Sequence, residues 1–121
     1  MSLRQESLEK LRQAVKDKTL GIYKGATVCL YYDAQTDSRC AVGAIIPDKT
    51  IEKMKDGNGN CAKFIDYSKS NSVKSQLKGM KTYRGLTVDE LVRLQEMHDD
   101  IIFGDYNYTI EEFEQYVASL K

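Results

Sequence analysis

The sequence predicts a single α+β domain over residues 1–121, in which a small antiparallel hairpin or short sheet is covered by three to five helices. Helix-capping patterns precede amphipathic segments at both ends of the chain. Two apolar runs between them are rich in residues that favour strands. A chain of 121 residues is also long enough to bury one core but not two.

Three helices are predicted by the capping box, a Ser or Thr followed three residues later by Glu or Gln. The boxes are Ser2/Gln5, Thr87/Glu90 and Thr109/Glu112. The first predicts a packing helix without chemistry that ends at Gly21. The second predicts a helix to about Phe103, with Gly104 as its left-handed C-terminal residue. Together with the third, it predicts that the chain ends in an αα-hairpin.

The strands are predicted at residues 26–32 (ATVCLYY) and 40–46 (CAVGAII), paired as a hairpin across the polar turn 33–38. The second run is apolar at nearly every position, so we expect both of its faces to be covered. Gly43 inside it predicts a bulge, a bend or the close approach of another backbone.

The segments that follow are expected to be short. Pro47 and Asp48 predict the start of a short helix. Residues 56–60 (DGNGN) predict a loop, and residues 61–67 suit a strand or a helix equally well. The spacing of Val73 and Leu77 predicts a weak helix before Gly79.

Composition indicates a soluble protein, with 41% hydrophobic and 30% charged residues. No apolar run approaches the roughly 18 residues that span a bilayer, and the charged N-terminal segment does not resemble a signal peptide. We therefore expect a cytoplasmic protein without a membrane partner. Zero net charge and the lack of a basic recognition helix argue against duplex DNA as a partner.

The charge is unevenly distributed along the chain. Residues 1–84 hold sixteen Lys or Arg against nine Asp or Glu, whereas residues 85–121 hold two against nine. The two parts can neutralise each other inside the fold, offer a basic surface to an anionic ligand, or support head-to-tail self-association.

We predict no catalytic residue, no metal site and no cofactor, and consider an enzyme the less favoured class. The three cysteines lack the spacing of a disulfide framework or a zinc ribbon. A thiolate–imidazole pair between Cys40 or Cys61 and His98 has no supporting sequence context. The run from His98 to Asp100 matches part of a metal-binding pattern, but the chain has no second histidine.

A ligand site is predicted where basic residues gather between positions 63 and 84, interleaved with Tyr67 and Tyr83. Arginine can bind phosphate in a bidentate manner, and a tyrosine ring can stack on a base. Gln95 and His98 also interrupt the apolar face of the helix that begins at Thr87. We expect these polar side chains either to contact the ligand or to form hydrogen bonds with the 40–46 segment. The predicted ligand-binding residues are Lys78, Lys81, Tyr83, Arg84, Gln95 and His98.

Two motifs, CAVGAIIPD at 40–48 and LVRLQEMHD at 91–99, resemble those of a group of small uncharacterised bacteriophage and prophage proteins. The resemblance implies an accessory role in the host cytoplasm, such as counter-defence, without a mechanism. Combined with the basic cluster, it leads us to expect a homo-oligomer that binds a small anionic molecule such as a nucleotide signal. The alternative is an inhibitor that binds a host protein through its acidic C-terminal face.

Overall fold

The computed structural model describes residues 1–65, 68 and 70–121, so the segment predicted at 61–67 lies partly outside the described residues. The helices are α1 (Leu3–Asp17), α2 (Gly21–Lys24), the 3₁₀ helix η1 (Gly43–Ile45), α3 (Asp48–Met54), α4 (Val73–Gln76), α5 (Val88–Phe103) and α6 (Ile110–Ser119). The strands β1 (Thr82–Tyr83) and β2 (Leu86–Thr87) pair antiparallel. The predicted small α+β fold, with a short two-stranded sheet among helices, is confirmed.

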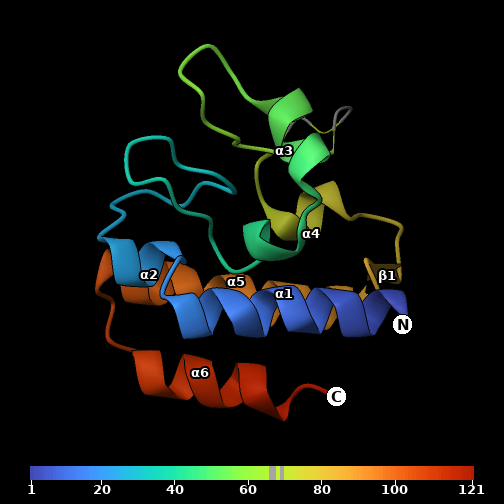
Figure 1. Cartoon of the computed structure of the whole chain (residues 1–121), viewed down its shortest axis with the longest axis vertical. Coiled ribbons are helices and arrows are strands. Elements are labelled where there is room, and N and C mark those ends of the chain that lie inside the picture. The colour runs from blue at the N-terminus through green and yellow to red at the C-terminus, as the bar shows by residue number, and fades with distance from the viewer. Residues whose placement is uncertain (66–67, 69) are drawn as a thin grey trace.

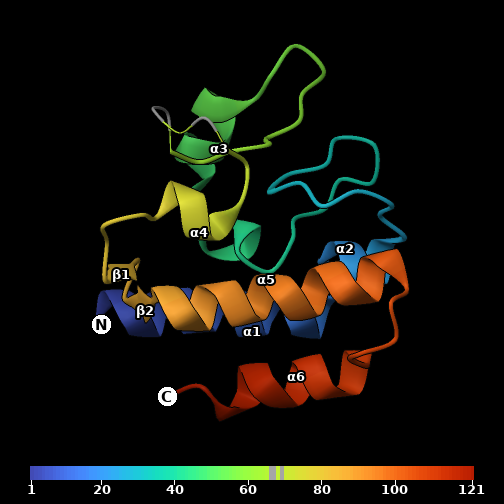
Figure 2. The ribbon, with the colours of Figure 1, turned by 180° about the vertical axis from the view of Figure 1, so that it is seen from behind.

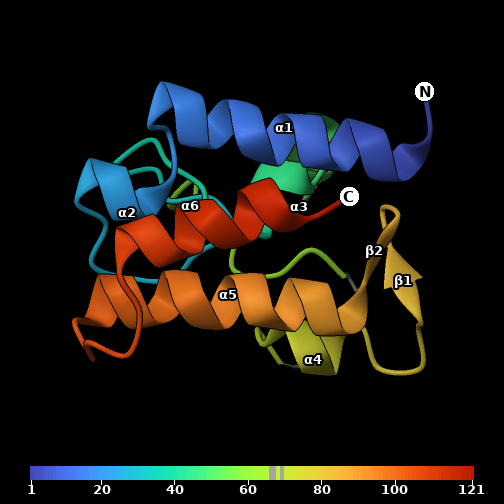
Figure 3. The ribbon, with the colours of Figure 1, turned by 90° about the horizontal axis from the view of Figure 1, so that it is seen from below.

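The elements form three layers (Figure 1). Helices α1 and α5 lie side by side in the middle layer and run in the same direction. Helix α6 runs the opposite way and packs against both of them from one side (Figure 3). The short helices and loops between α2 and β1 cover the other side, as the view from behind also shows (Figure 2). None of the helices in the described ranges has the length and apolarity needed to cross a bilayer.

All three predicted capping boxes are present, with both reciprocal hydrogen bonds in each. Gly104 ends α5 in the left-handed conformation, at φ 70°. Only the end of α1 differs from the prediction. The helix stops at Asp17, where Lys18 takes the left-handed cap at φ 59°, and Gly21 begins α2 instead.

The hairpin predicted between residues 26–32 and 40–46 is wrong. Residues 26–32 and 40–46, all of which the structure describes, belong to no strand, and only the middle of the second run forms a helix, η1. What remains of the predicted pairing is an isolated antiparallel bridge between Asp33 and Ser38 and one hydrogen bond from the Cys40 N–H to the Leu30 carbonyl at 3.3 Å. A Cβ on Gly43 would lie 2.1 Å from the Tyr31 carbonyl oxygen, so the two backbones approach each other closely at this point without forming a ladder. Gly43 therefore marks the close backbone approach that was one of its three predicted roles.

The observed hairpin lies directly before α5. Thr82 faces Thr87 and Tyr83 faces Leu86 across a two-residue turn. Arg84 and Gly85 form that turn with φ of 54° and 82°, the positive values of a type I′ turn. This hairpin leads the chain straight into the capping box of α5.

Arg4 joins the two ends of the chain. Its guanidinium donates to both Glu90 carboxylate oxygens at 2.8 Å, and its Nε donates to the Lys121 carbonyl at 2.6 Å. Lys18 and Glu114 form a second ion pair at 3.3 Å. Both pairs link the basic residues 1–84 to the acidic residues 85–121, so part of the charge asymmetry is neutralised inside the fold.

Candidate functional site

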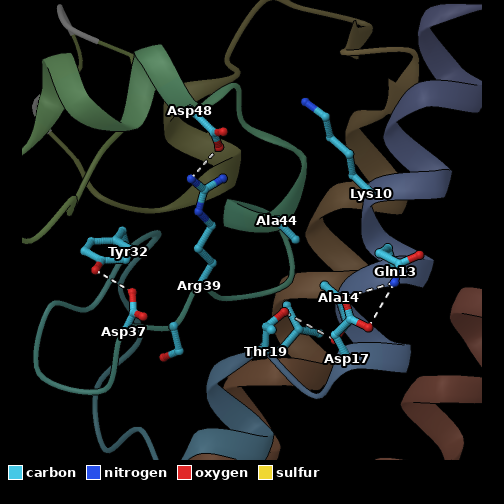
Figure 4. Close-up of a pocket in the computed structure, with 12 residues that line it drawn as sticks. Lys10, Gln13, Ala14, Asp17, Thr19, Tyr32, Asp37, Arg39, Ala44 and Asp48 are labelled. Atoms are coloured by element: carbon cyan, nitrogen blue, oxygen red, sulfur yellow. Dashed lines mark hydrogen bonds and ion pairs between the residues drawn. The ribbon is translucent and has the colours of Figure 1, made fainter.

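A cavity of about 660 Å³ opens between α1, the loop at residues 37–39, η1 and the start of α3; we call it the α1–Arg39 cleft (Figure 4). One wall is α1. Lys10, Gln13 and Asp17 line it because spacings of three and four residues place side chains on one helix face. The Gln13 amide donates to both Asp17 carboxylate oxygens at 2.9 Å. The Lys10 ammonium has no hydrogen-bond or ion-pair partner among the described residues and extends toward the side where Asp48 lies.

The opposite wall centres on Arg39, whose side chain is 25% exposed. Its guanidinium donates to Asp48 at 2.8 Å and to the carbonyls of Ile46 at 3.1 Å and Gly43 at 3.3 Å. These bonds fix the guanidinium at the junction of η1 and α3. Arg39 therefore presents a positive charge whose position is set by backbone groups.

Tyr32 and Asp37 complete this wall. The Tyr32 hydroxyl donates to the Asp37 carboxylate at 2.8 Å, and this hydrogen bond raises the pKa of Tyr32. The Lys55 ammonium lies 4.6 Å from the centre of the Tyr32 ring. Each of the three carboxylates that line the cleft thus has a donor within the chain, from Gln13, Tyr32 or Arg39.

The cleft is polar but not strongly basic, because its two cations face three carboxylates. The carboxylates are already hydrogen-bonded, whereas the Lys10 ammonium is not. Lys10 and Arg39 line one cavity together with hydrogen-bond acceptors, a lining that suits a single anionic group.

The predicted basic ligand residues lie elsewhere. Lys78 and Lys81 are exposed in the connection from α4 to β1. The half-buried Tyr83 ring packs against Phe64, with 5.0 Å between ring centroids. The Arg84 carbonyl accepts from the Ser7 hydroxyl at 2.6 Å, and the buried Arg84 Nε has no hydrogen-bond partner in the part of the chain that the structure describes. None of these four lines the α1–Arg39 cleft or the second cleft described below.

Gln95 contacts the 40–46 segment, as expected of a fold determinant. Its Oε1 accepts from the Val42 N–H at 3.4 Å, and its amide donates to Asp99 at 2.8 Å. It also lines a second cleft of about 520 Å³ between α4, α5 and residues 29–31. Gln95 is thus a predicted site residue that borders one of the two clefts described here.

The prediction that His98 forms a hydrogen bond to the 40–46 segment is wrong. The ring is fully buried, and neither nitrogen has a hydrogen-bond partner among the described residues. It packs edge-on against Phe113 at 6.1 Å and lies beside Gly21. Burial lowers the pKa of His98 to about 3, so the ring is neutral and has no exposed surface to offer a ligand.

The thiols are poor candidates for catalysis. Burial, more than the hydrogen bond to Asp99, raises the pKa of the Cys29 thiol, and burial raises that of Cys40 to about 12. Burial also raises the pKa of Cys61. Thiols held protonated at neutral pH are weak nucleophiles. No group of three or more potential metal ligands is found within residues 1–65, 68 and 70–121.

The cleft residues were not predicted as a site. The sequence predicts a packing helix without chemistry for the segment that carries Lys10 and Asp17, and nothing in the sequence pairs Arg39 with either of them. The fold brings them together through the packing of α1 on η1. Comparisons of the chain with models of protein families, with curated proteins and with solved structures found no match.

Proposed function

We propose that the protein is a non-enzymatic binding protein for a small molecule with one anionic group, such as a nucleoside monophosphate, and that the α1–Arg39 cleft is its site. The observation that carries the proposal is the Lys10 ammonium, which has no partner in the described part of the chain and lines the same cavity as Arg39. A bound phosphate or carboxylate would give Lys10 a partner and share the fixed charge of Arg39.

The size and the lining of the cleft favour a compact ligand. Small-molecule sites usually enclose about 300–1,000 Å³, and this cleft encloses about 660 Å³. Sugar hydroxyls can donate to the lining carboxylates of Asp17 and Asp37, and the Tyr32 ring offers an apolar surface. A triphosphate would place further negative charge near Asp48, so a monophosphate is the better match.

This proposal keeps the anionic ligand expected from the sequence but assigns it a different site. The basic segment around Lys78, Lys81 and Arg84 is the competing location, since its two lysines are exposed. It lines neither of the two clefts, so it would hold an anion on the surface rather than enclose it. Variants of the two locations therefore distinguish them.

Isothermal titration calorimetry with adenosine monophosphate, adenosine triphosphate and adenosine tests the proposal. We expect the monophosphate to bind most tightly, and Lys10→Ala to weaken its binding about tenfold or more by removing a charge-assisted contact. Lys16→Ala is the matched control, because Lys16 is exposed on the same helix and does not line the cleft. Arg39 is a poorer test position because it also supports the backbone at Ile46.

Two results would count against the proposal. The first is that none of the three compounds gives a binding signal at millimolar concentration. The second is monophosphate binding that survives Lys10→Ala but disappears in a Lys81→Ala, Arg84→Ala double variant, which would place the ligand on the basic segment.

A further inference from the structure

Exposed apolar residues gather at one end of the molecule, where α5 connects to α6. Phe103 is 58% exposed, Tyr106 is 94% exposed and Ile110 is 38% exposed. They fall within eight consecutive positions and lie at the paired ends of two packed helices. We call these three residues the Tyr106 patch.

The connection that carries the patch is held in one conformation by Asp100, a residue only 8% exposed. Its carboxylate accepts from the backbone N–H groups of Asn107 at 3.1 Å and Tyr108 at 2.9 Å, and from the Asn107 amide at 2.8 Å. Its carbonyl accepts from the Asp105 N–H at 3.1 Å. A loop fastened in this way loses little conformational entropy when a partner binds.

Tyr106, at the tip of this connection, is held in a strained conformation. Its φ of 64° lies in the left-handed region, which is unfavourable for a bulky side chain. The ring projects almost entirely into solvent, so packing within the chain does not offset this cost. A large aromatic residue that is both strained and exposed is better explained by a contact with another molecule than by the fold.

The segment of the chain that carries the patch is acidic. Residues 94–120 contain no Lys or Arg and seven Asp or Glu. Asp105, Glu111 and Glu112 are exposed beside the patch, and none forms an ion pair with another described residue. A partner that covers the apolar centre would bring its own rim against these carboxylates, so charge complementarity requires a basic rim.

We propose that the Tyr106 patch is a docking surface for a partner protein that presents an apolar stripe flanked by Lys and Arg. Tyr106 and Phe103 would form the buried centre of this interface, and Asp105 and Glu111 would form its rim. The surface is separate from the α1–Arg39 cleft, and its function does not depend on ligand binding there.

The probe is a short amphipathic helical peptide of Leu and Lys, compared with a peptide in which Glu replaces every Lys. We expect the basic peptide to bind at low salt (about 50 mM) and to weaken as salt rises, because the rim contacts are screened. The acidic peptide should not bind. Chemical-shift changes in NMR spectra should map to residues 103–111.

Tyr106→Gly separates a binding role from a structural one. It removes the ring and relieves the left-handed strain, so we expect about tenfold weaker peptide binding without loss of thermal stability. A Tyr106 that only supports the fold would instead lose stability. Met80→Ala is the matched control, since Met80 is an exposed apolar residue outside the patch. The double substitution Asp105→Lys, Glu111→Lys should weaken binding of the basic peptide. It should leave α6 folded, because the capping box of α6 uses Glu112.

Three outcomes would overturn the proposal. The first is that the basic peptide does not bind. The second is that it binds the Tyr106→Gly variant as tightly as the wild type. The third is that the acidic peptide binds as well as the basic one. A fourth is a dimer, detected by light scattering, that Tyr106→Gly dissociates, because the patch would then be covered by a second copy of the chain.

Discussion

The three long helices α1, α5 and α6 and the segment from residue 26 to 65 belong to one packed fold, but they are stabilised differently. Each long helix begins with a complete capping box, in which residues three positions apart satisfy each other. The irregular segment is held by contacts between distant residues, such as the Gln76 side chain bound to the Phe64 and Ile65 backbone. Local information therefore specifies the first region, and tertiary contacts specify the second.

Gly43→Ala, in the irregular segment, should reduce the stability of the protein most. The added Cβ would lie 2.1 Å from the Tyr31 carbonyl oxygen, and neither backbone can move without disturbing buried neighbours. We expect a loss of more than about 4 kcal/mol in the free energy of unfolding by urea, or failure to fold. Gly57→Ala is the control, because a Cβ there meets nothing within 4 Å. Equal effects at the two positions would contradict the proposed contact.

Gln76→Leu should cause the next largest loss of stability. The buried Gln76 carbonyl oxygen accepts from the N–H groups of Phe64 at 2.7 Å and Ile65 at 3.0 Å, and leucine would leave both without a partner. We expect a loss of about 3 kcal/mol in the free energy of unfolding. Hydrogen exchange should accelerate first around residues 61–65 and not in α6. Gln115→Leu, on the exposed side of α6, should change stability little.

This division explains which predictions from the sequence were correct. The boxes at Ser2, Thr87 and Thr109 depend on neighbouring residues, so the long helices could be predicted. Residues 26–32 and 40–46 have the composition of strands, but the close approach at Gly43 overrides that preference. The short hairpin at 82–87 was missed because its signal is only two residues, Arg84 and Gly85, with positive φ.

The candidate site shows the same limit. Gln95 could be recognised because it is a polar residue on an apolar helix face, and it does contact the 40–46 segment. The same argument predicts a hydrogen bond from His98 to that segment, whereas the ring nitrogens have no partner among the described residues and the ring packs against Phe113. Lys10 and Arg39 are 29 positions apart in the sequence and share a cavity only in the fold.

Glu90→Gln probes the junction between the N-terminal and C-terminal helices. The hydrogen bonds from Arg4 lower the pKa of Glu90 to about 2 from its ordinary value of 4.5. Its stabilising contribution is therefore complete above pH 4.5 and is lost as pH falls toward 2. We expect Glu90→Gln to cost about 2 kcal/mol at neutral pH and almost nothing near pH 2, measured by chemical denaturation. Glu9→Gln, on an exposed face of α1, should show no such convergence.

His98→Leu should change the free energy of unfolding least at neutral pH. In acid, the substitution should make the protein more stable than the wild type. The folded state holds the pKa of His98 at about 3, below its ordinary value of 6.5, so the unfolded chain binds a proton first as pH falls. The wild type then loses about 1.4 kcal/mol per pH unit below about pH 6.5, and the leucine variant does not. Parallel stability curves for the two proteins between neutral pH and about pH 5 would indicate that the ring is not buried.

The most direct test of the functional account is an NMR titration of the isotopically labelled protein with adenosine monophosphate. The account predicts that the largest chemical-shift changes fall on Lys10, Gln13 and Arg39, and that they disappear in Lys10→Ala. Changes centred on Lys78 to Arg84, or no changes at millimolar ligand, would contradict it.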